Sequence, residues 1–450
     1  MRAEPSDAPT LLQRIDLRGV SNPGGSLPRP APGGERPLEA VQQIIEDVRS
    51  RGDSALLELT ERFDGVLPTS LSVPPTDIDA ALARVPAEVR AALELAARRI
   101  EEHHRAQLHP PTTHESAGVS VRSIAKPVRS AGCYVPGGRA VYPSTLLMTA
   151  IPAKVAGVQR VAVCVPPERS TGGVAEVTLA AAAVAGVQEV YAVGGAQAVA
   201  ALAYGTETID PVEVICGPGN LYVAVAKAQV AGDVGIAAAF AGPSEVVVVA
   251  DRSVAPELVA IDLMLQAEHG PDGLAWLVCW DSEVADAVDI ALGGLLETAP
   301  RRGDITSTLA RSGYSVVLDD PQAAIEVVDF VAPEHLELLC EGAEELAGSV
   351  HNAGAIFCGP WSPASLGDYL AGPSHVLPTH GSARFSSALG VADFMKDVHI
   401  ITASPEGLAE LGPATATLAD AEGLDAHAES VRMRMRMLTD GEQGGDDGGA

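Results

Sequence analysis

Gln266, Glu268 and His269 bring an amide, a carboxylate and an imidazole together at the end of the segment PELVAIDLMLQAEHG. Apolar residues recur there with helical spacing, so Gln266 and His269, three residues apart, would lie on one helix face, with Asp262 one turn earlier. Imidazole nitrogens and side-chain oxygens suit zinc or another borderline divalent ion. Glu268 directly precedes His269 and would point away from the shared face, so we do not expect it to be a ligand.

Further candidate ligands follow this helix in the sequence. Asp368 and His375 lie in the glycine-rich segment LGDYLAGPSH, and Glu422 and His427 lie in AEGLDAHAE. A histidine near a helix end is more often a helix cap than a metal ligand. The supply of additional carboxylates and imidazoles is what favours a metal site.

Pro333, Glu334 and His335 form a second group of residues that could serve catalysis. Proline is favoured in the first turn of a helix, so the sequence predicts a helix beginning here, with a carboxylate and an imidazole side by side. Such a pair can supply two proton acceptors of different basicity. An ordinary helix start, in which Glu334 is favoured by the helix dipole, explains the same residues equally well.

The dinucleotide fingerprint G-x-G-x-x-G is absent from the sequence. Its nearest counterpart is the stretch 217–220, GPGN, which follows the strand-like VEVIC and precedes a helical segment, but Tyr222 occupies the third glycine position. Two other glycine-bearing strand ends, YVPGG at 134–138 and GGAQ at 194–197, would converge with it at the carboxyl edge of one parallel sheet, where ligands usually bind. Tight turns between strands and helices remain the alternative for each motif.

The elements that would position these residues alternate between short apolar strands and alanine-rich helices. From about residue 134 the order RVAVCVPP, VAEVTLAAAAVAG, EVYAVG, AQAVAALAYG is typical of βαβ units and a parallel sheet. A second such region begins with SEVVVVAD and continues through LAWLVCW to YSVVLDD. We therefore expect an α/β fold with two Rossmann-like parallel-sheet domains.

Composition agrees with a globular enzyme of 450 residues, since 47% of them are hydrophobic and 20% are charged. Lys and Arg number 30 against 59 Asp and Glu, a net charge of −29 that disfavours nucleic acid and anionic membranes as partners. The sequence has neither an apolar stretch of membrane-spanning length nor a signal peptide, so we expect a cytoplasmic protein. Its six cysteines lack any C-x-x-C pair and are expected to be core residues.

Taken together, the ordered motifs resemble the histidinol dehydrogenase family over nearly the whole chain. They are RIDLRGV, YVPGG, GGAQAVAALAYGTE, GPGN, AGPSE, QAEH, PEHLE, GDYLAGPSHVLPT, FSSALGV and AEGLDAH. Members of that family are zinc enzymes that complete histidine biosynthesis by oxidising an amino alcohol, histidinol, to the amino acid in two NAD-dependent steps. The resemblance therefore implies an oxidoreductase.

The resemblance also implies roles for individual residues. Glu334 and His335 would be the catalytic acid and base, with His335 taking the hydroxyl proton and Glu334 activating the water of the second step. The implied zinc ligands are Gln266, His269, Asp368 and His427, and these side chains also surround the substrate. Substrate would further contact Ser244, His335, His375 and Glu422, while NAD would contact Tyr134, Gln197 and Asn220.

The family is homodimeric, and its C-terminal segments reach into the partner's site, which implies the same for Glu422 and His427. On this basis we expect five regions. They are an N-terminal arm and linker (1–37), a first α/β domain with zinc and catalytic residues (38–133 and 244–389), a second, NAD-binding α/β domain (134–243), C-terminal segments that complete the partner's site (390–437) and an acidic disordered tail (438–450).

The sequence departs from the family pattern at Ala237 and Ala238, where the family usually has Ile-Asp before the Gly-Pro-Ser-Glu motif. The loss of this acidic side chain bears on the identity of the substrate and not on the chemistry. Two alternatives to histidinol oxidation stay open. One is a paralogous zinc and NAD dehydrogenase that acts on another small polar alcohol, such as a sulfonated diol. The other is a metal-binding paralogue without catalytic activity, which should have lost proton-transfer residues such as Glu334 and His335.

Overall fold

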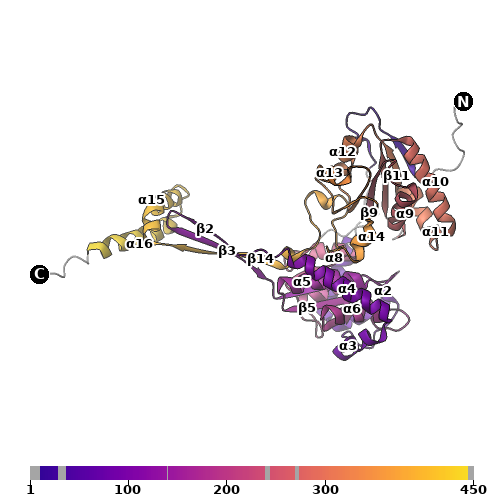
Figure 1. Cartoon of the computed structure of the whole chain (residues 1–450). Coiled ribbons are helices and arrows are strands. Elements are labelled where there is room, and N and C mark those ends of the chain that lie inside the picture. Colours follow the sequence, from indigo (N-terminus) through magenta and orange to yellow (C-terminus); the bar gives the residue numbers. More distant parts are fainter. Residues whose placement is uncertain (1–10, 29–36, 139, 239–243, 269–272, 444–450) are drawn as a thin grey trace. The chain divides into compact units, whose positions relative to one another are not determined.

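The computed structural model describes residues 11–28, 37–138, 140–238, 244–268 and 273–443. The chain divides into two compact units (Figure 1). The first unit comprises residues 1–107 and 128–394, and the second comprises 108–127 and 395–450. His269, one of the predicted zinc ligands, lies outside the described residues.

One sheet of the first unit has six parallel strands in the order β1-β11-β10-β9-β12-β13. The strands are β1 (Gln13–Asp16), β9 (Glu245–Ala250), β10 (Leu274–Cys279), β11 (Gly313–Val317), β12 (His335–Leu339) and β13 (Ala355–Cys358). In β9, alternate valines pack on opposite faces, so the strand is apolar on both faces after Glu245. Helices α9 (Pro256–Ala267), α10 (Ser282–Thr298) and α11 (Arg302–Ser312) cover one face, and α12 (Pro321–Val331) and α13 (Ala343–Ala347) cover the other.

The other sheet of this unit has five parallel strands in the order β6-β5-β4-β7-β8. The strands are β4 (Ser130–Tyr134), β5 (Arg160–Val165), β6 (Glu189–Ala192), β7 (Val214–Cys216) and β8 (Gly235–Ile236). Helices α7 (Gly195–Tyr204) and α8 (Leu221–Val230) pack on one face, with α1 (Leu38–Arg51) and α2 (Asp53–Asp64) against them. The remaining helices α5 (Pro143–Ala156) and α6 (Glu176–Ala185) pack with α3 (Pro75–Arg84) and α4 (Ala87–Arg105).

The predicted domain division differs from the structure at residues 38–133 and in the N-terminal arm. The region 38–133 was expected with the six-stranded sheet, but its helices α1 and α2 join the core of the five-stranded sheet. Part of the predicted N-terminal arm, residues 13–16, forms the edge strand β1 of the six-stranded sheet. Helical periodicity shows that a face is apolar but does not identify the surface that it covers.

The second unit is built on a three-stranded antiparallel sheet in the order β14-β3-β2. Its strands are β2 (Thr112–Ser116), β3 (Val119–Pro127) and β14 (Met395–Ala403), and two helices follow, α15 (Pro405–Ala421) and α16 (Asp425–Gln443). The C-terminal segments therefore pair with residues 119–127, which had been assigned to the first domain. Helix α16 also extends into the stretch 438–443 that was expected to belong to a disordered tail.

The turn between β2 and β3 touches the start of α15. Gly118 has a φ of +68°, and a Cβ atom added to it would lie 2.6 Å from the Cα of Gly407. Ala117, the other residue of this two-residue turn, also has a positive φ of 48°. Only glycine fits at position 118 without displacing the helix.

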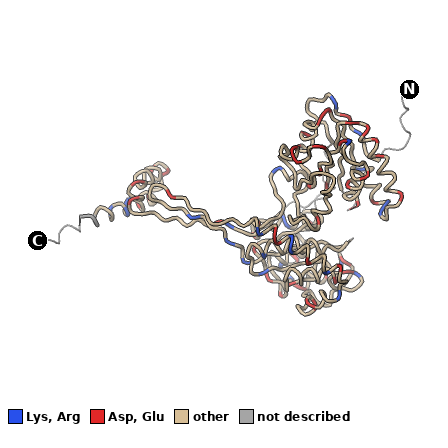
Figure 2. Tube along the Cα trace, in the orientation of Figure 1, with Lys and Arg blue, Asp and Glu red and all other residues tan. Residues whose placement is uncertain are grey.

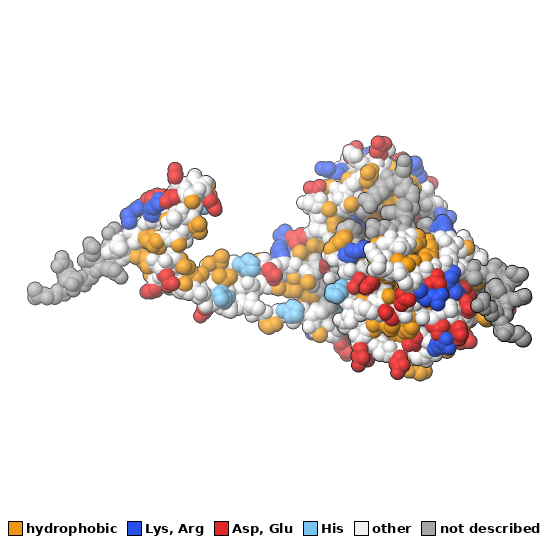
Figure 3. Space-filling view, turned by 90° about the horizontal axis from the view of Figure 1, so that it is seen from above, with side chains coloured by type: hydrophobic (Ala, Val, Ile, Leu, Met, Phe, Trp, Pro, Cys, Tyr) orange, Lys and Arg blue, Asp and Glu red, His pale blue; other side chains and the backbone are white. Residues whose placement is uncertain are grey.

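The charge and the exposed hydrophobic side chains of the two units indicate which partners they could bind. Lys and Arg are interspersed among more numerous Asp and Glu along the described chain (Figure 2). Figure 3 shows hydrophobic side chains gathered on the second unit, where the exposed ones include Ile400, Ile401, Leu418, Met433 and Met437. Within the described ranges, none of the helices combines the length and apolar character needed to cross a membrane.

Candidate active site

Glu334 and His335 lie at the amino end of β12, not at the start of a helix as the sequence predicts. Helix α12 ends at Val331, Ala332 caps it with a left-handed backbone, and β12 begins at His335. The proline therefore separates a helix from a strand. His335 pairs with Val246 of β9, so the amino ends of these two parallel strands lie side by side.

Two carboxylates flank the ring of His335. Its Nδ1 lies 3.7 Å from Oε2 of Glu334, and its Nε2 lies 3.5 Å from Oδ1 of Asp368 on α14 (Ala364–Tyr369). The side chain is 5% exposed, and within the described part of the chain neither ring nitrogen has a hydrogen bond of ordinary geometry. Such a buried imidazole with both nitrogens available is suited to proton transfer with a ligand.

Glu245, the first residue of β9, completes this cluster from the neighbouring strand. Its backbone N–H donates to Oε2 of Glu334 at 3.0 Å, and its own Oε1 accepts from the N–H of Gly381 at 3.4 Å. Burial, together with the nearby charge of Glu334, raises the pKa of Glu245 to about 8. Several buried carboxyl groups thus crowd one small volume.

The same crowding shifts the pKa values of the two predicted catalytic residues, Glu334 and His335. Burial raises the pKa of Glu334 to about 7, although the positive charge of His335 opposes the shift. Burial lowers the pKa of His335, but the carboxylates of Glu334 and Asp368 outweigh it and raise the pKa to about 9. At neutral pH the ring of His335 therefore holds a proton while Glu334 is close to its own pKa, so the two groups can act as an acid–base pair.

Glu337 connects the elements that carry the predicted ligands. It is two residues after His335 on β12, is fully buried, and accepts a 3.0 Å hydrogen bond from the N–H of Ala364 at the start of α14. Its carboxyl group also interacts with that of Asp262 on α9. Burial and this second carboxyl group raise the pKa of Glu337 to about 9, so the protonated form is favoured at neutral pH.

The predicted zinc ligands are only partly described. Gln266 is buried at the end of α9, and Asp368 faces His335 from α14. These helices meet β12 through Asp262 and Glu337. Among the described residues, no group of three or more His, Cys, Asp or Glu side chains stands close enough to hold a metal ion.

The remaining predicted substrate contacts are spread over both units. In the first unit, Nδ1 of His375 donates to the backbone carbonyl of Asp368 at 2.9 Å, and its Nε2 is 2.9 Å from Oγ1 of Thr145. Ser244 is half-buried directly before β9. Glu422, at the end of α15, and His427, on α16, are exposed and belong to the second unit.

The three glycine-bearing loops do converge at the carboxyl edge of the five-stranded sheet. The hydroxyl oxygen of Tyr134, at the end of β4, accepts from the N–H of Gly195 at 3.1 Å. Gly217 follows β7 with a φ of +105°, and a Cβ atom there would lie 2.0 Å from the carbonyl oxygen of Tyr134. A residue other than glycine could not bring these two loops together.

Polar side chains at this edge have different surroundings. Gln197 is 1% exposed, yet within the described part of the chain neither its amide nitrogen nor its amide oxygen has a hydrogen-bond partner. Asn220 caps α8, and its side-chain oxygen accepts from the N–H groups of Tyr222 and Val223. An unsatisfied buried amide is costly unless a ligand supplies its partners.

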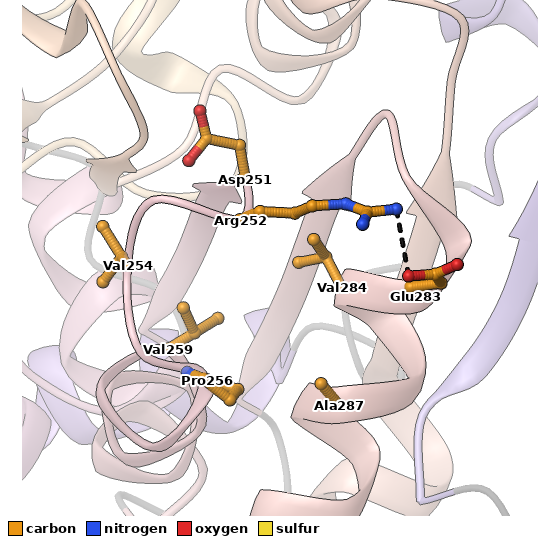
Figure 4. A pocket seen from close by; sticks show the side chains of 8 residues that line it. All are labelled: Asp251, Arg252, Val254, Pro256, Val259, Glu283, Val284 and Ala287. Carbon is orange, nitrogen blue, oxygen red and sulfur yellow. Dashed lines mark ion pairs between the residues drawn. The ribbon is translucent and has the colours of Figure 1, made fainter.

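A separate pocket of about 220 Å³ lies at the opposite, carboxyl end of β9 and β10 (Figure 4). Arg252 lines it, but its guanidinium pairs with both Asp281 and Glu283. Its charge is thereby compensated within the protein. None of the predicted site residues lines this pocket.

Sequence reasoning missed Glu245 and Glu337. Both carry a signal that could have been used, because each interrupts an otherwise apolar strand segment, SEVVVVA and HLELLC. A charged residue on a strand that is buried on both faces must find partners inside the protein.

Comparisons with known proteins identify the family of this chain. The sequence model of the histidinol dehydrogenase family matches residues 28–435. Histidinol dehydrogenases of Parasynechococcus marenigrum and Rhizobium meliloti are 49% and 48% identical to this chain, covering 88% and 90% of it and 90% and 92% of their own lengths. The crystal structure of histidinol dehydrogenase from Elizabethkingia anophelis matches with a TM-score of 0.91 at 34% identity, over 96% of this chain and 99% of that one. The chain is an oxidoreductase that belongs to the histidinol dehydrogenase family.

Proposed function

We propose that this protein oxidises L-histidinol to L-histidine, the last step of histidine biosynthesis, with NAD as the hydride acceptor and zinc as a cofactor. Family membership over most of the chain supports the reaction. The observation that carries the proposal is the buried ring of His335, which lies between the carboxylates of Glu334 and Asp368.

The reaction balances as two successive two-electron oxidations. The alcohol loses a hydride to one NAD⁺ and a proton to the protein, which gives the aldehyde. Water adds to the aldehyde, and the hydrate loses a second hydride to another NAD⁺ and a second proton, which gives the carboxylic acid. Each substrate therefore yields two NADH.

The proton transfers are assigned to Glu334, which directly precedes β12, and to His335, which begins it. His335 would accept the proton of the substrate hydroxyl, and Glu334 would accept a proton from the attacking water. The pKa of Glu334, about 7, suits a group that must accept a proton at neutral pH. The pKa of His335, about 9, keeps its ring protonated until the charge of Asp368 is compensated.

A divalent cation would be held by Gln266, His269 and Asp368, with His427 from the second unit of a partner subunit. The described donors, an amide and a carboxylate oxygen, fit this role, because both suit zinc and Asp368 adjoins the catalytic ring. When bound, the metal would act as a Lewis acid and template for the substrate and would neutralise the carboxylate of Asp368.

The surroundings of the site fit a cationic amino alcohol. The pKa of Glu334, about 7, leaves this carboxyl group partly ionised at neutral pH, and the chain carries a net charge of −29, so a positively charged substrate would be attracted to the site. Ser244, His375 and Glu422 would add contacts with the substrate.

NAD would bind at the carboxyl edge of the five-stranded sheet, in contact with Tyr134, Gln197 and Asn220. The two unpaired amide atoms of Gln197 support this part of the proposal, because a ligand with donors and acceptors would satisfy them.

A homodimer would bring the second unit of one subunit to the first unit of the other. Its exposed apolar side chains, among them Ile401 at 68% and Leu418 at 67% exposure, favour burial against another protein surface. Glu422 and His427 would then complete the partner's site.

Ala237 and Ala238 favour one alternative, a related dehydrogenase of another polar alcohol. Ala237 is buried and its N–H donates to the carbonyl of Ile215, while Ala238 has a φ of 46°. Neither supplies the acidic side chain that the family usually has here. A substrate panel that includes sulfonated diols distinguishes the two substrates.

The decisive measurement is the number of NADH molecules formed per histidinol consumed by zinc-loaded protein. Two would support four-electron oxidation, whereas one would indicate a simple alcohol dehydrogenase and none an inactive paralogue. Chelation of the metal should abolish the activity, and zinc should restore it.

A Glu334→Gln variant tests the role of the acid. It should retain alcohol oxidation but lose most of the second step, so that the ratio approaches one NADH per substrate. Glu341→Gln is the matched control, because Glu341 follows the far end of the same strand and is exposed. A Glu334→Gln protein that still yields two NADH at the normal rate would contradict the assignment.

A further inference from the structure

Lys227 of α8 is a buried cation below the loop 217–220. Its side chain is fully buried, and its Nζ donates to the backbone carbonyl of Gly217 at 2.9 Å. Within the described residues this is its one hydrogen bond, and no carboxylate lies within ion-pairing distance of it. Long side chains on a helix point toward its N-terminus, which brings this amine back under the loop.

The surroundings of Lys227 do not neutralise its charge. Burial lowers its pKa to about 8, and the group that acts in the opposite direction is the thiol of Cys216. That thiol is itself buried and lies 3.7 Å from the sulfur of Cys133 on the adjacent strand. A buried charge without a counter-ion destabilises a fold, so such a residue points to a role in binding.

The position of Lys227 suggests which ligand would supply the missing negative charge. The loop 217–220 packs against the carbonyl of Tyr134 at one end, through Gly217, and ends at Asn220, the cap of α8. Tyr134 and Asn220 are both predicted NAD contacts, and the amine of Lys227 binds the loop between them. The N-terminus of a helix adds a partial positive charge at the same place. Here the side chain of Asn220 already occupies two of the first N–H groups, which leaves more of the electrostatic role to the lysine.

We propose that Lys227 is a positioning residue for the dinucleotide. Its buried ammonium group holds Gly217 in place through the hydrogen bond to the carbonyl of that residue, and it provides a positive charge on the far side of the loop 217–220 from the pyrophosphate. This inference rests on the proposed use of NAD. It adds that the loop 217–220 recognises the pyrophosphate of NAD and that Lys227 is the residue responsible.

Lys227→Met tests the proposal, with binding of NAD and of ADP-ribose measured by calorimetry. Both ligands contain the pyrophosphate, and both should bind about tenfold or more weakly to the variant. At saturating NAD, kcat should stay within about twofold of the wild type, because the loss is in ground-state binding. The midpoint of thermal unfolding should stay the same or rise, a result that a purely structural role would not produce.

Lys154→Met is the matched control. Lys154 also donates to backbone carbonyls, those of Ala185 and Gly186 at the end of α6, but it is exposed and this helix end precedes β6 at the other edge of the sheet. This variant should bind NAD like the wild type. Lys227→Gln provides a second test, because it keeps a donor without the charge, and it should also bind NAD weakly.

The possible failures are distinguishable. Wild-type affinity in Lys227→Met, or in Lys227→Gln, would overturn this inference and leave the proposed function intact. A wild-type protein that binds neither NAD nor ADP-ribose would overturn the proposed cofactor and this inference with it.

Discussion

Nε2 of His335 lies 3.5 Å from Oδ1 of Asp368, so the first residue of a strand and a residue of a short helix meet at one buried point. Asp368 is also one of the predicted metal ligands. The proposed proton acceptor and the predicted metal-binding carboxylate are therefore electrostatically coupled, and a change in the charge of one alters the pKa of the other.

Replacing His335 should remove proton transfer without removing NAD binding. We expect His335→Gln to lower kcat by about 10²–10⁴-fold, which is the usual contribution of a general base. Affinity for NAD should be unchanged, because the predicted NAD contacts belong to the other sheet. The exposed His351, which pairs with Asp329, provides the control His351→Gln. Steady-state kinetics that placed His335→Gln within about threefold of the wild type would contradict the assignment.

Glu337 should tolerate an amide but not a hydrocarbon. Since the protonated carboxyl group is favoured at neutral pH, Glu337→Gln has nearly the same shape and can still accept from Ala364. Glu337→Leu leaves the N–H of Ala364 and the carboxyl of Asp262 without this partner. It should lower the free energy of unfolding by about 2–4 kcal/mol, measured in urea, and lower kcat because α14 carries Asp368. Equal stability of the two variants would show that Glu337 does not connect these elements.

The turn between β2 and β3 offers a test of the second unit. Asn is favoured over Ala where a two-residue hairpin turn needs positive φ, so Ala117→Asn should stabilise the hairpin by about 0.5–1 kcal/mol. Gly118→Ala should destabilise it by about 1–2 kcal/mol or more, because the new methyl group meets Gly407. Amide hydrogen exchange in β3 should become slower in the first variant and faster in the second. The same direction of change in both would refute this account.

Lys227 should give the stability of the protein a distinctive pH dependence. Its pKa is lowered from 10.5 in the unfolded chain to about 8 in the fold, so between these pH values the unfolded chain binds more protons. The free energy of unfolding therefore rises with pH through this window, by about 3 kcal/mol in total from this group.

Lys227→Met lacks this titration and serves as the comparison. Its stability relative to the wild type should be greatest below pH 8 and should decrease toward pH 10.5. Urea unfolding at both ends of the window measures the difference. A difference that is independent of pH would mean that the lysine is not buried as a cation.

Strands that are buried on both faces could be predicted from the sequence with little ambiguity. The run of four valines in β9 and the alternating order from β5 to α8 leave few other interpretations, and glycines marked the strand ends that converge near Tyr134. The segment around Glu334 could not be assigned in this way. A short apolar stretch after proline fits a helix start as well as a strand, and the choice depends on pairing with β9.

Contacts between segments that are distant in the sequence could not be predicted either. Nothing local in residues 119–127 indicates pairing with 395–403, and the apolar face of α1 does not identify its sheet. The carboxyl cluster was missed for a related reason. Glu245 lies 89 positions before Glu334, and only the parallel pairing of β9 with β12 places the two side by side.

The edge strand β1 has a practical consequence for anyone who shortens this chain. The match to the family model begins at residue 28 and so leaves out Gln13–Asp16, the strand that pairs with β11. A protein trimmed to the family boundary would keep every predicted site residue, but the edge of β11 that pairs with β1 would be left open. Its first failure would be self-association through that edge, at concentrations where the full chain stays dispersed.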